Sequence, residues 1–217
     1  MSEPLPALTA TQVMRDAPVI PVIVLNDAAY AVPLARALLA GGIRMLEVTL
    51  RTPQALACIE AIVREVPEAV VGAGTVRSAA DAQSAASAGA RFAVSPGFTD
   101  AIAQACRDLQ LPWLPGVATS SEIMRCLEAG LNELKFFPAM AGGGVAMLKA
   151  WHGPFGEARF CPTGGVTLQN APELLALPNV ACVGGSWLVL EDALVADDWG
   201  RITRLAQQTM ALRKVSS

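Results

Sequence analysis

Short apolar runs alternate with longer amphipathic or alanine-rich stretches along most of the chain. The runs are rich in β-branched residues, as expected of parallel strands that are buried on both faces. They predict strands at residues 19–25, 45–50, 70–76, 91–95, 111–117, 133–137, 158–161 and 180–183. The stretches between them predict helices at residues 28–40, 53–66, 79–88, 100–109, 121–129, 145–151, 170–176 and 199–213, with a short leading helix at residues 8–15. Ser78, Thr99 and either Ser120 or Ser121 are the expected N-caps of three of these helices.

The strand–helix unit recurs eight times, roughly every 20–27 residues, which is a spacing that suits βαβ units. No change in composition marks a linker between domains. We therefore expect an α/β fold in which residues 1–217 form one domain, a (β/α)8 TIM barrel with a short N-terminal helix. An open doubly wound sheet is the alternative. Its nucleotide-binding fingerprint GxGxxG is absent, because the stretch Gly72-Ala-Gly-Thr-Val-Arg77 lacks the third glycine.

Composition and charge exclude several classes of function. Hydrophobic residues make up 53% of the chain and charged residues 16%, which favours a large core over disorder. The net charge is −3, without blocks of one sign, so we expect no nucleic-acid and no membrane partner. The longest apolar run, residues 19–25, is far shorter than the roughly 20 residues of a membrane span.

Cysteine and histidine usage argues against disulfides and metal sites. The five cysteines form no CxxC pair, and we expect them to be reduced thiols in the core. The single histidine, His152, makes a histidine-based metal site or a serine–histidine triad hard to build. We therefore expect a protein that needs no metal and no cofactor. No secretory signal is visible at the start of the sequence, so we also expect the protein to be cytoplasmic.

Two strands carry charged residues at positions expected to face the interior. Lys135 lies in the apolar run Glu133-Leu-Lys-Phe-Phe-Pro138, and Glu47 shares one strand parity with Thr49 and Arg51. Desolvation disfavours a charged lysine among apolar neighbours, and a neutral amine can attack a carbonyl to form a Schiff base. A neighbouring buried carboxylate such as Glu47 can act as general acid/base. The alternatives are a lysine that extends to water and a structural ion pair.

Further polar residues follow the predicted strands, where the site of a barrel is built. Arg51 is placed to clamp a carboxylate in bidentate fashion, although a surface contact is equally compatible with its position. Thr75 follows two glycines that let the backbone approach a ligand, or it is a simple capping threonine. Pro96 belongs to the turn Ser95-Pro-Gly97, which alone is a weak signal.

Two glycine pairs follow the last two predicted strands. They are Thr163-Gly-Gly165 and Gly184-Gly-Ser186. In barrels of this kind the corresponding loops bind phosphate through exposed backbone N–H groups. Either pair alone is more typical of a turn, but together they predict a phosphate site at the ends of the last two strands.

Several segments together resemble the 2-keto-3-deoxy-6-phosphogluconate (KDPG) aldolase family, which also handles 4-hydroxy-2-oxoglutarate (KHG). The matching segments occur in the family's order over nearly the whole chain: Pro18-Val-Ile-Pro-Val-Ile-Val24, Glu47-Val-Thr-Leu-Arg-Thr52, Val71-Gly-Ala-Gly-Thr75, Ser95-Pro-Gly97, Pro115-Gly116, Lys135-Phe-Phe-Pro-Ala139, Phe160-Cys-Pro-Thr-Gly-Gly165 and Gly184-Gly-Ser-Trp187.

The resemblance implies a class I aldolase that splits phosphorylated KDPG into pyruvate and glyceraldehyde 3-phosphate. Lys135 would be the Schiff-base lysine and Glu47 the acid/base. The pyruvate end would be held by Arg51, Thr75 and the turn at Pro96. Further along the substrate, Thr163 would face its hydroxyl groups, and Gly164, Gly165, Gly185 and Ser186 its phosphate. The resemblance also implies a homotrimer without a metal ion. A phosphosugar isomerase or epimerase on the same barrel, with Glu47 as base, remains the alternative.

Overall fold

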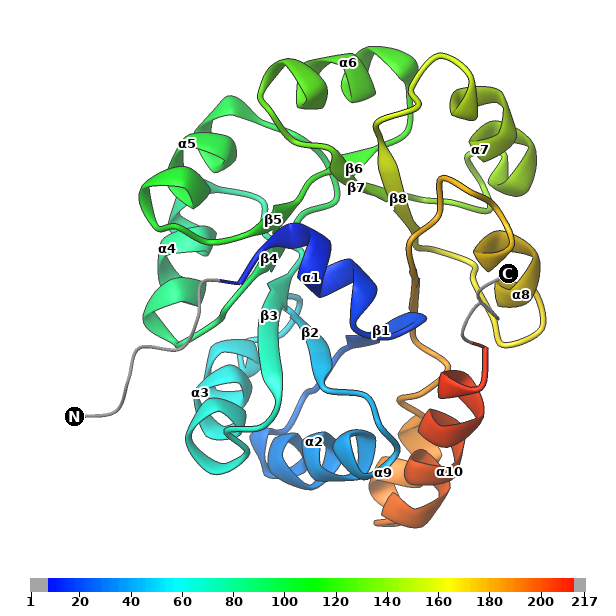
Figure 1. Ribbon diagram of the computed structural model, residues 1–217. Helices are drawn as coiled ribbons and strands as arrows, with labels where there is room; N and C mark the ends of the chain where they lie inside the picture. Colours follow the sequence, from blue (N-terminus) through cyan, green and yellow to red (C-terminus); the bar gives the residue numbers. More distant parts are fainter. Residues whose placement is uncertain (1–7, 213–217) are drawn as a thin grey trace.

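The computed structural model describes residues 8–212 of the 217-residue chain as alternating parallel strands and helices. The strands lie at the centre and most of the helices surround them, as Figure 1 shows. The strands are β1 Val19–Ile23, β2 Met45–Thr49, β3 Val70–Gly74, β4 Ala93–Val94, β5 Trp113–Leu114, β6 Gly116–Val117, β7 Glu133–Phe136, β8 Arg159–Pro162 and β9 Val183–Gly185. The helices are α1 Ala10–Arg15, the 3-10 turn η1 Ala28–Tyr30, α2 Ala31–Ala40, α3 Ala55–Glu65, α4 Ala79–Ser87, α5 Asp100–Asp108, α6 Ser120–Glu128, α7 Gly144–His152, α8 Ala171–Leu175, α9 Glu191–Val195 and α10 Trp199–Met210.

The strands form two parallel sheets, one with the order β5-β4-β3-β2-β1-β9 and one with the order β6-β7-β8. Pro115 separates β5 from β6, so a single extended segment lies at the edge of both sheets. Its carbonyl accepts a hydrogen bond of 2.8 Å from Lys135 N, although proline has no N–H to donate. At the other edges, parallel bridges join Phe160 to Val180 and Thr163 to Gly184. The predicted α/β class with parallel strands is confirmed.

Buried apolar side chains form two layers. The outer layer lies between strands and helices and includes Leu46 and Val48 of β2. The inner layer is smaller and includes Met45 of β2 with Val13 and Met14 of α1. Helix α1 crosses the centre of the strands in Figure 1 and closes one end of this inner layer. Alternate residues of β2 therefore face opposite layers, as strand geometry requires and as the sequence predicted.

Two helices begin at other residues than the sequence predicted. Ser78 and Thr99 are N-caps as predicted, but Thr119, and neither Ser120 nor Ser121, caps α6. Thr119 and Glu122 form a reciprocal capping box, which fixes the start of the helix one residue earlier. The leading helix begins at Ala10, because the Thr9 side chain caps it.

The last strand lies further along the chain than predicted. The prediction placed it at residues 180–183, whereas β9 runs over Val183–Gly185. Val180 forms an isolated bridge with Phe160 outside the strand, and Gly184 and Gly185 are part of the strand and not of a loop after it. Helix α9 was not predicted, and residue 213, the predicted end of the last helix, lies outside the described residues.

Candidate active site

Lys135 and Glu47 meet in the interior between the two sheets. Glu47 is the middle residue of β2 in the six-stranded sheet, and Lys135 lies in β7 of the three-stranded sheet. Lys135 Nζ donates a hydrogen bond of 3.2 Å to Glu47 Oε1. Their side chains are 5% and 4% exposed, so bulk water screens this pair little. The structure thus brings together an amine and a carboxylate that are nearly closed off from solvent, as the sequence predicted.

Phe137 is a neighbour of the amine that the sequence reasoning did not assign to the site. Its ring centroid lies 5.4 Å from Lys135 Nζ, within the range of a cation–π contact. Phe137 follows Lys135 by two residues and therefore shares its face in an extended chain. That parity was the available signal. Phe137 also lines the cavity described next, whereas Lys135 and Glu47 are not among its lining residues.

A cavity of ≈ 210 Å³ opens at the carboxyl ends of the strands. It is lined by Val22, Val24, Arg51, Phe137, Thr163, Gly164, Gly165, Val166, Gly184 and Ser186. Five residues predicted from the sequence are among these: Arg51, Thr163, Gly164, Gly165 and Ser186. The segments after β2, β7, β8 and β9 thus converge on one space, which is where sites form in parallel α/β folds.

One predicted phosphate residue is placed differently from its neighbours. Gly185 does not line this cavity, and a Cβ atom there would overlap the Trp187 ring. Gly184, which belongs to the predicted glycine pair but was not itself assigned to the phosphate, does line it. A Cβ atom on Gly184 would lie 2.9 Å from Thr163 Cγ2, so the missing side chain lets β9 approach the threonine closely.

Arg51 and Thr75 are held together at the rim. Arg51 Nε donates a hydrogen bond of 3.2 Å to Thr75 Oγ1, a contact that does not involve the terminal guanidinium nitrogens. Thr75 has φ 58°, a left-handed conformation that β-branched residues rarely adopt. Such backbone conformations are costly and cluster at functional sites. The arrangement suits a guanidinium that presents its terminal nitrogens to an anion.

Pro96 lies on a turn that neighbouring groups fix in place. Ser95 Oγ donates to Gly97 O at 2.6 Å and accepts from Trp113 Nε1 at 2.9 Å. A Cβ atom on Gly116 would lie 2.6 Å from Gly97 N, so the turn packs directly on the start of β6. Pro96 itself is exposed and does not line the 210 Å³ cavity.

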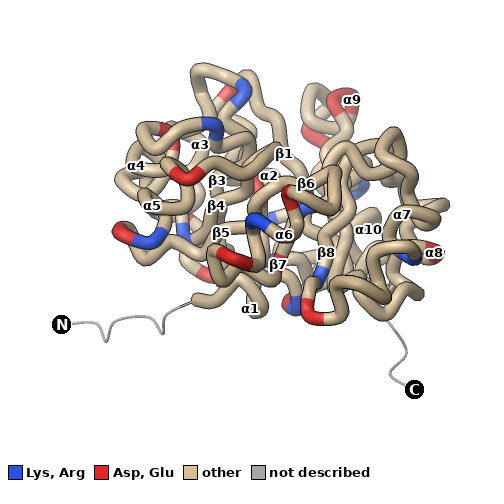
Figure 2. Tube along the Cα trace, turned by 90° about the horizontal axis from the view of Figure 1, so that it is seen from above, with Lys and Arg blue, Asp and Glu red and all other residues tan. Residues whose placement is uncertain are grey.

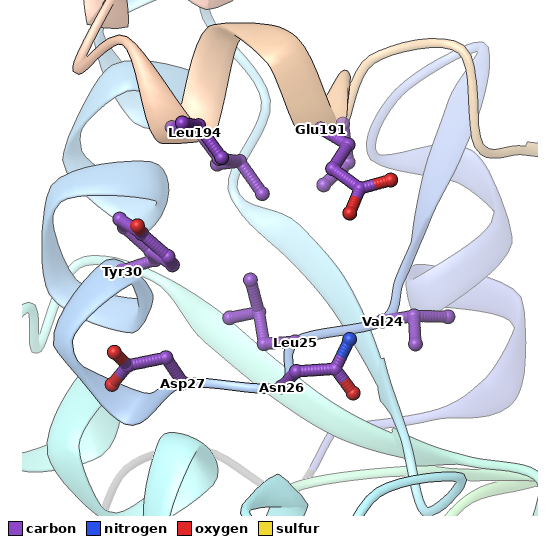
Figure 3. Close-up of a pocket in the computed structure, with 9 residues that line it drawn as sticks. Val24, Leu25, Asn26, Asp27, Tyr30, Glu191 and Leu194 are labelled. Carbon is purple, nitrogen blue, oxygen red and sulfur yellow. The ribbon is translucent and has the colours of Figure 1, made fainter.

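Charge distinguishes this cavity from a larger one beside it. The larger space, ≈ 300 Å³, shares Val24 with it and is lined by residues 24–27 together with Tyr30, Val189, Glu191, Leu194 and Val195. Figure 3 shows the carboxylates of Asp27 and Glu191 at its edges. An anion would be repelled there, whereas the smaller cavity is lined by Arg51 and by three glycines, with no acidic residue among the described residues around it. A third space of ≈ 220 Å³ lies beside α1 and Glu133, whose carboxylate accepts a hydrogen bond from Thr11.

The five cysteines are all free and buried, as predicted from the sequence. Burial raises the pKa of the Cys106 thiol to about 11 and that of Cys126 to about 12. The pKa of Cys182 is raised as well, first by a hydrogen bond with Cys161 and then by desolvation. Thiols of this kind are poor nucleophiles at neutral pH, so the reactive group of the site is not among these three.

Over residues 8–212, no group of three or more His, Cys, Asp or Glu side chains is arranged to hold a metal ion. None of the helices in this part of the chain is long and apolar enough to cross a membrane. Acidic and basic residues are interspersed along the described chain in Figure 2.

A family model, a sequence relative and a solved structure identify the same protein family. The family model described as "KDPG and KHG aldolase" matches residues 10–205. The 2-dehydro-3-deoxy-phosphogluconate aldolase of Dickeya dadantii is 51% identical over 203 residues, which cover 94% of this chain and 95% of that protein. A similar solved structure is that of a KDPG aldolase from Legionella pneumophila, with pyruvate captured at low pH as a covalent carbinolamine intermediate. It matches with a TM-score of 0.91 and 48% identity, over 94% of this chain and 98% of that one.

A second solved structure matches as closely in fold. The 2-keto-3-deoxy-6-phosphogluconate aldolase of Zymomonas mobilis ZM4, crystallised with 3-phosphoglycerate, has a TM-score of 0.90 and 46% identity, over 95% of this chain and 97% of that one. The family model and the full-length relative agree with the resemblance drawn from the sequence motifs. The chain belongs to the KDPG and KHG aldolase family.

Proposed function

We propose that this chain is a class I aldolase that cleaves KDPG into pyruvate and glyceraldehyde 3-phosphate through a Schiff base on Lys135. The observation that carries the proposal is the buried Lys135 amine, which lies 3.2 Å from the Glu47 carboxylate and contacts the Phe137 ring. Phe137 in turn lines the cavity that Arg51 and two glycine segments also line. The members of its family are carbon–carbon lyases, which supports this reaction class.

The first half of the reaction belongs to Lys135. Its ammonium group, which is paired with Glu47 before the substrate binds, gives up a proton, and the neutral amine adds to the C2 ketone to give a carbinolamine. A proton is taken up again when water leaves and the iminium ion forms. A covalent carbinolamine with pyruvate in the Legionella pneumophila relative supports this chemistry for the family. The iminium withdraws electrons from the C3–C4 bond. Cleavage of that bond therefore gives an enamine in place of an unstabilised carbanion.

The second half needs a group that moves protons. Glu47 takes the proton of the C4 hydroxyl, directly or through a water, as the aldehyde product leaves. The same carboxyl group then returns a proton to C3 of the enamine, and hydrolysis of the resulting iminium releases pyruvate and frees Lys135. The short distance between Lys135 and Glu47 supports this role, since general acid/base groups must lie within hydrogen-bond reach of the reacting atoms.

The remaining residues would orient the substrate. The pyruvate carboxylate would be bound by Arg51, supported by Thr75 and the turn at Pro96. The hydroxyl groups would face Thr163, and the phosphate would lie against Gly164, Gly165, Gly185 and Ser186. The phosphate-bearing ligand of the Zymomonas mobilis relative supports a phosphorylated substrate. KHG, which shares the pyruvate half, would be a second substrate, split into pyruvate and glyoxylate.

We also propose that the described strands close into an eight-stranded (β/α)8 barrel, and that the chain is a single domain. The segment around Pro115 borders both sheets, and bridges from Phe160 and Thr163 to residues 180–184 lie at the opposite edges. The contact between Glu47 and Lys135 across the interior supports the same closure. By family resemblance the protein would be a homotrimer, and we propose that it is cytoplasmic. Val24 and Val195, which are 38% and 71% exposed, offer apolar surface beside the larger cavity.

The test is a coupled assay for pyruvate with KDPG as substrate. We expect pyruvate and glyceraldehyde 3-phosphate in equal amounts, and loss of cleavage in Lys135→Met. Lys149→Met, on the exposed face of α7, is the matched control and should retain activity. Interconversion of a phosphosugar without pyruvate would instead support the isomerase or epimerase. Binding of KDPG without turnover would overturn both enzymatic assignments.

A further inference from the structure

Gly74 faces the carboxylate of Glu47 from the neighbouring strand. Strands β2 and β3 pair in parallel, with Thr49 opposite Gly74 and Glu47 opposite Gly72. A Cβ atom on Gly74 would lie 2.6 Å from Glu47 Cγ and 2.8 Å from Cδ, and closer still to Oε1. The Glu47 side chain therefore leans along β3 and fills the space that a side chain at position 74 would need.

Backbone conformation does not demand a glycine at this position. Gly74 is not among the residues with positive φ, unlike Thr75 directly after it. Its register and its hydrogen bond from Leu50 N to Gly74 O, at 2.8 Å, are those of an ordinary parallel strand. Alanine could adopt this backbone, so the requirement for glycine arises from the space that the carboxylate occupies.

We infer that Gly74 is a positioning residue for the aldolase reaction: the absence of a side chain on β3 seats the Glu47 carboxylate against Lys135. The inference rests on the proposed function, because it concerns the group that moves protons there. Oε1 is the atom that accepts from Lys135 Nζ and also the atom nearest the missing Cβ. A methyl group at this point would force the carboxylate to a new position, and a misplacement of about 1 Å costs on the order of 100-fold in rate.

The two halves of the reaction should respond differently to this change. Addition of the Lys135 amine to pyruvate does not require Glu47 to hold its native position. By contrast, exchange of the pyruvate methyl protons requires a base to take a proton from the iminium and to return a deuteron from solvent. Gly74→Ala should therefore still be trapped by pyruvate and borohydride, while methyl exchange and KDPG cleavage fall about 100-fold.

Gly72 provides a matched control on the same strand and the same face. The three atoms nearest to a Cβ atom on Gly72 would all belong to the Phe92 ring, whereas those nearest to a Cβ atom on Gly74 all belong to Glu47. Gly72→Ala thus also overfills the interior, but next to an apolar neighbour. We expect it to lower stability while it leaves the ratio of methyl exchange to borohydride trapping within about two-fold of the original protein.

The experiment measures borohydride trapping by mass spectrometry and methyl exchange by proton NMR in deuterated water, with pyruvate as probe. Loss of exchange with retained trapping in Gly74→Ala alone supports the inference. Equal exchange in Gly74→Ala and the original protein, or the same split in Gly72→Ala, overturns it. If the original protein neither traps nor exchanges pyruvate, the proposed function fails instead.

A second variant covers the case in which Gly74→Ala does not fold. Glu47→Ala empties the space next to β3, so Gly74→Ala should then be tolerated in the same chain. We expect Gly74→Ala/Glu47→Ala to unfold at the same urea concentration as Glu47→Ala alone. If the double variant fails to fold while Glu47→Ala folds, the space is not reserved for the carboxylate, and the inference is wrong.

Discussion

Replacing Lys135 by methionine would leave the Glu47 carboxylate buried without its partner. The two charged atoms lie 3.2 Å apart, which corresponds to an attraction of about 5 kcal/mol at an effective dielectric constant of about 20. Desolvation of both groups offsets much of that attraction in the intact pair. Removal of one partner keeps the desolvation cost and loses the attraction, so we expect Lys135→Met to lower the free energy of unfolding by about 3–5 kcal/mol. Glu47→Met should do the same by leaving the ammonium unpaired.

The double variant Lys135→Met/Glu47→Met gives the decisive comparison. Two apolar side chains of similar length replace the pair, so the double variant should be within about 1 kcal/mol of the original protein or more stable than it. Urea unfolding followed by tryptophan fluorescence measures all four proteins at one protein concentration, because an oligomer gains stability by mass action.

An exposed ion pair serves as control for this cycle. Arg64 and Glu65 lie 2.6 Å apart, but their side chains are 71% and 41% exposed. Arg64→Met should therefore change stability by less than about 1 kcal/mol. If Lys135→Met is as mild as Arg64→Met, or if the two interior substitutions are simply additive, the pair is not a coupled buried ion pair and the reasoning is refuted.

Three further predictions concern the rim, α1 and the thiols. Arg51→Gln should lower kcat/KM for KDPG by about 10- to 100-fold, since a hydrogen bond to a charged group contributes about 1.5–3 kcal/mol. Steady-state kinetics measures this, with the exposed Arg77→Gln as control. Equal kcat/KM values for the two variants would contradict the prediction. Met14→Ala, in the fully buried inner layer, should lower the free energy of unfolding by about 2–5 kcal/mol and leave KM unchanged. Met124 is 53% exposed, so Met124→Ala should lower that free energy by less than about 0.5 kcal/mol. Urea unfolding measures both variants. With pKa values of about 11 and 12, Cys106 and Cys126 are thiolates to only about one part in 1,000 and 10,000 at pH 8, and this fraction rises with pH. The folded protein should therefore react slowly with a thiol reagent at pH 8 until urea is added; labelling of these two residues within minutes without urea would be the contrary result.

The alternation of apolar and polar residues predicted the arrangement of the site well. Because side chains alternate along a strand, Glu47 could be assigned to the interior and Leu46 to the helix layer from residue order alone. The same rule applied to Lys135, and the strand ends located Arg51 and the glycine loops. These features are local, so they can be read from short stretches of sequence.

Other features depend on contacts between distant segments. The roles of Gly74 and Gly184 arise from the side chains of Glu47 and Thr163, which lie on neighbouring strands, and no local pattern distinguishes these glycines from turn glycines. Pro115 divides one apolar run between two sheets, a division that depends on which strands pair with it. The choice of Thr119 as N-cap could have been predicted, because Glu122 three residues later completes a capping box.

The central claim is that Lys135 forms a covalent bond with the substrate ketone. Incubation with pyruvate and borohydride, followed by proteolysis and mass spectrometry, tests it directly. We predict the mass of one reduced pyruvyl group on the peptide that contains Lys135, retained in Lys149→Met and lost in Lys135→Met. No adduct, or an adduct that persists in Lys135→Met, would contradict the account.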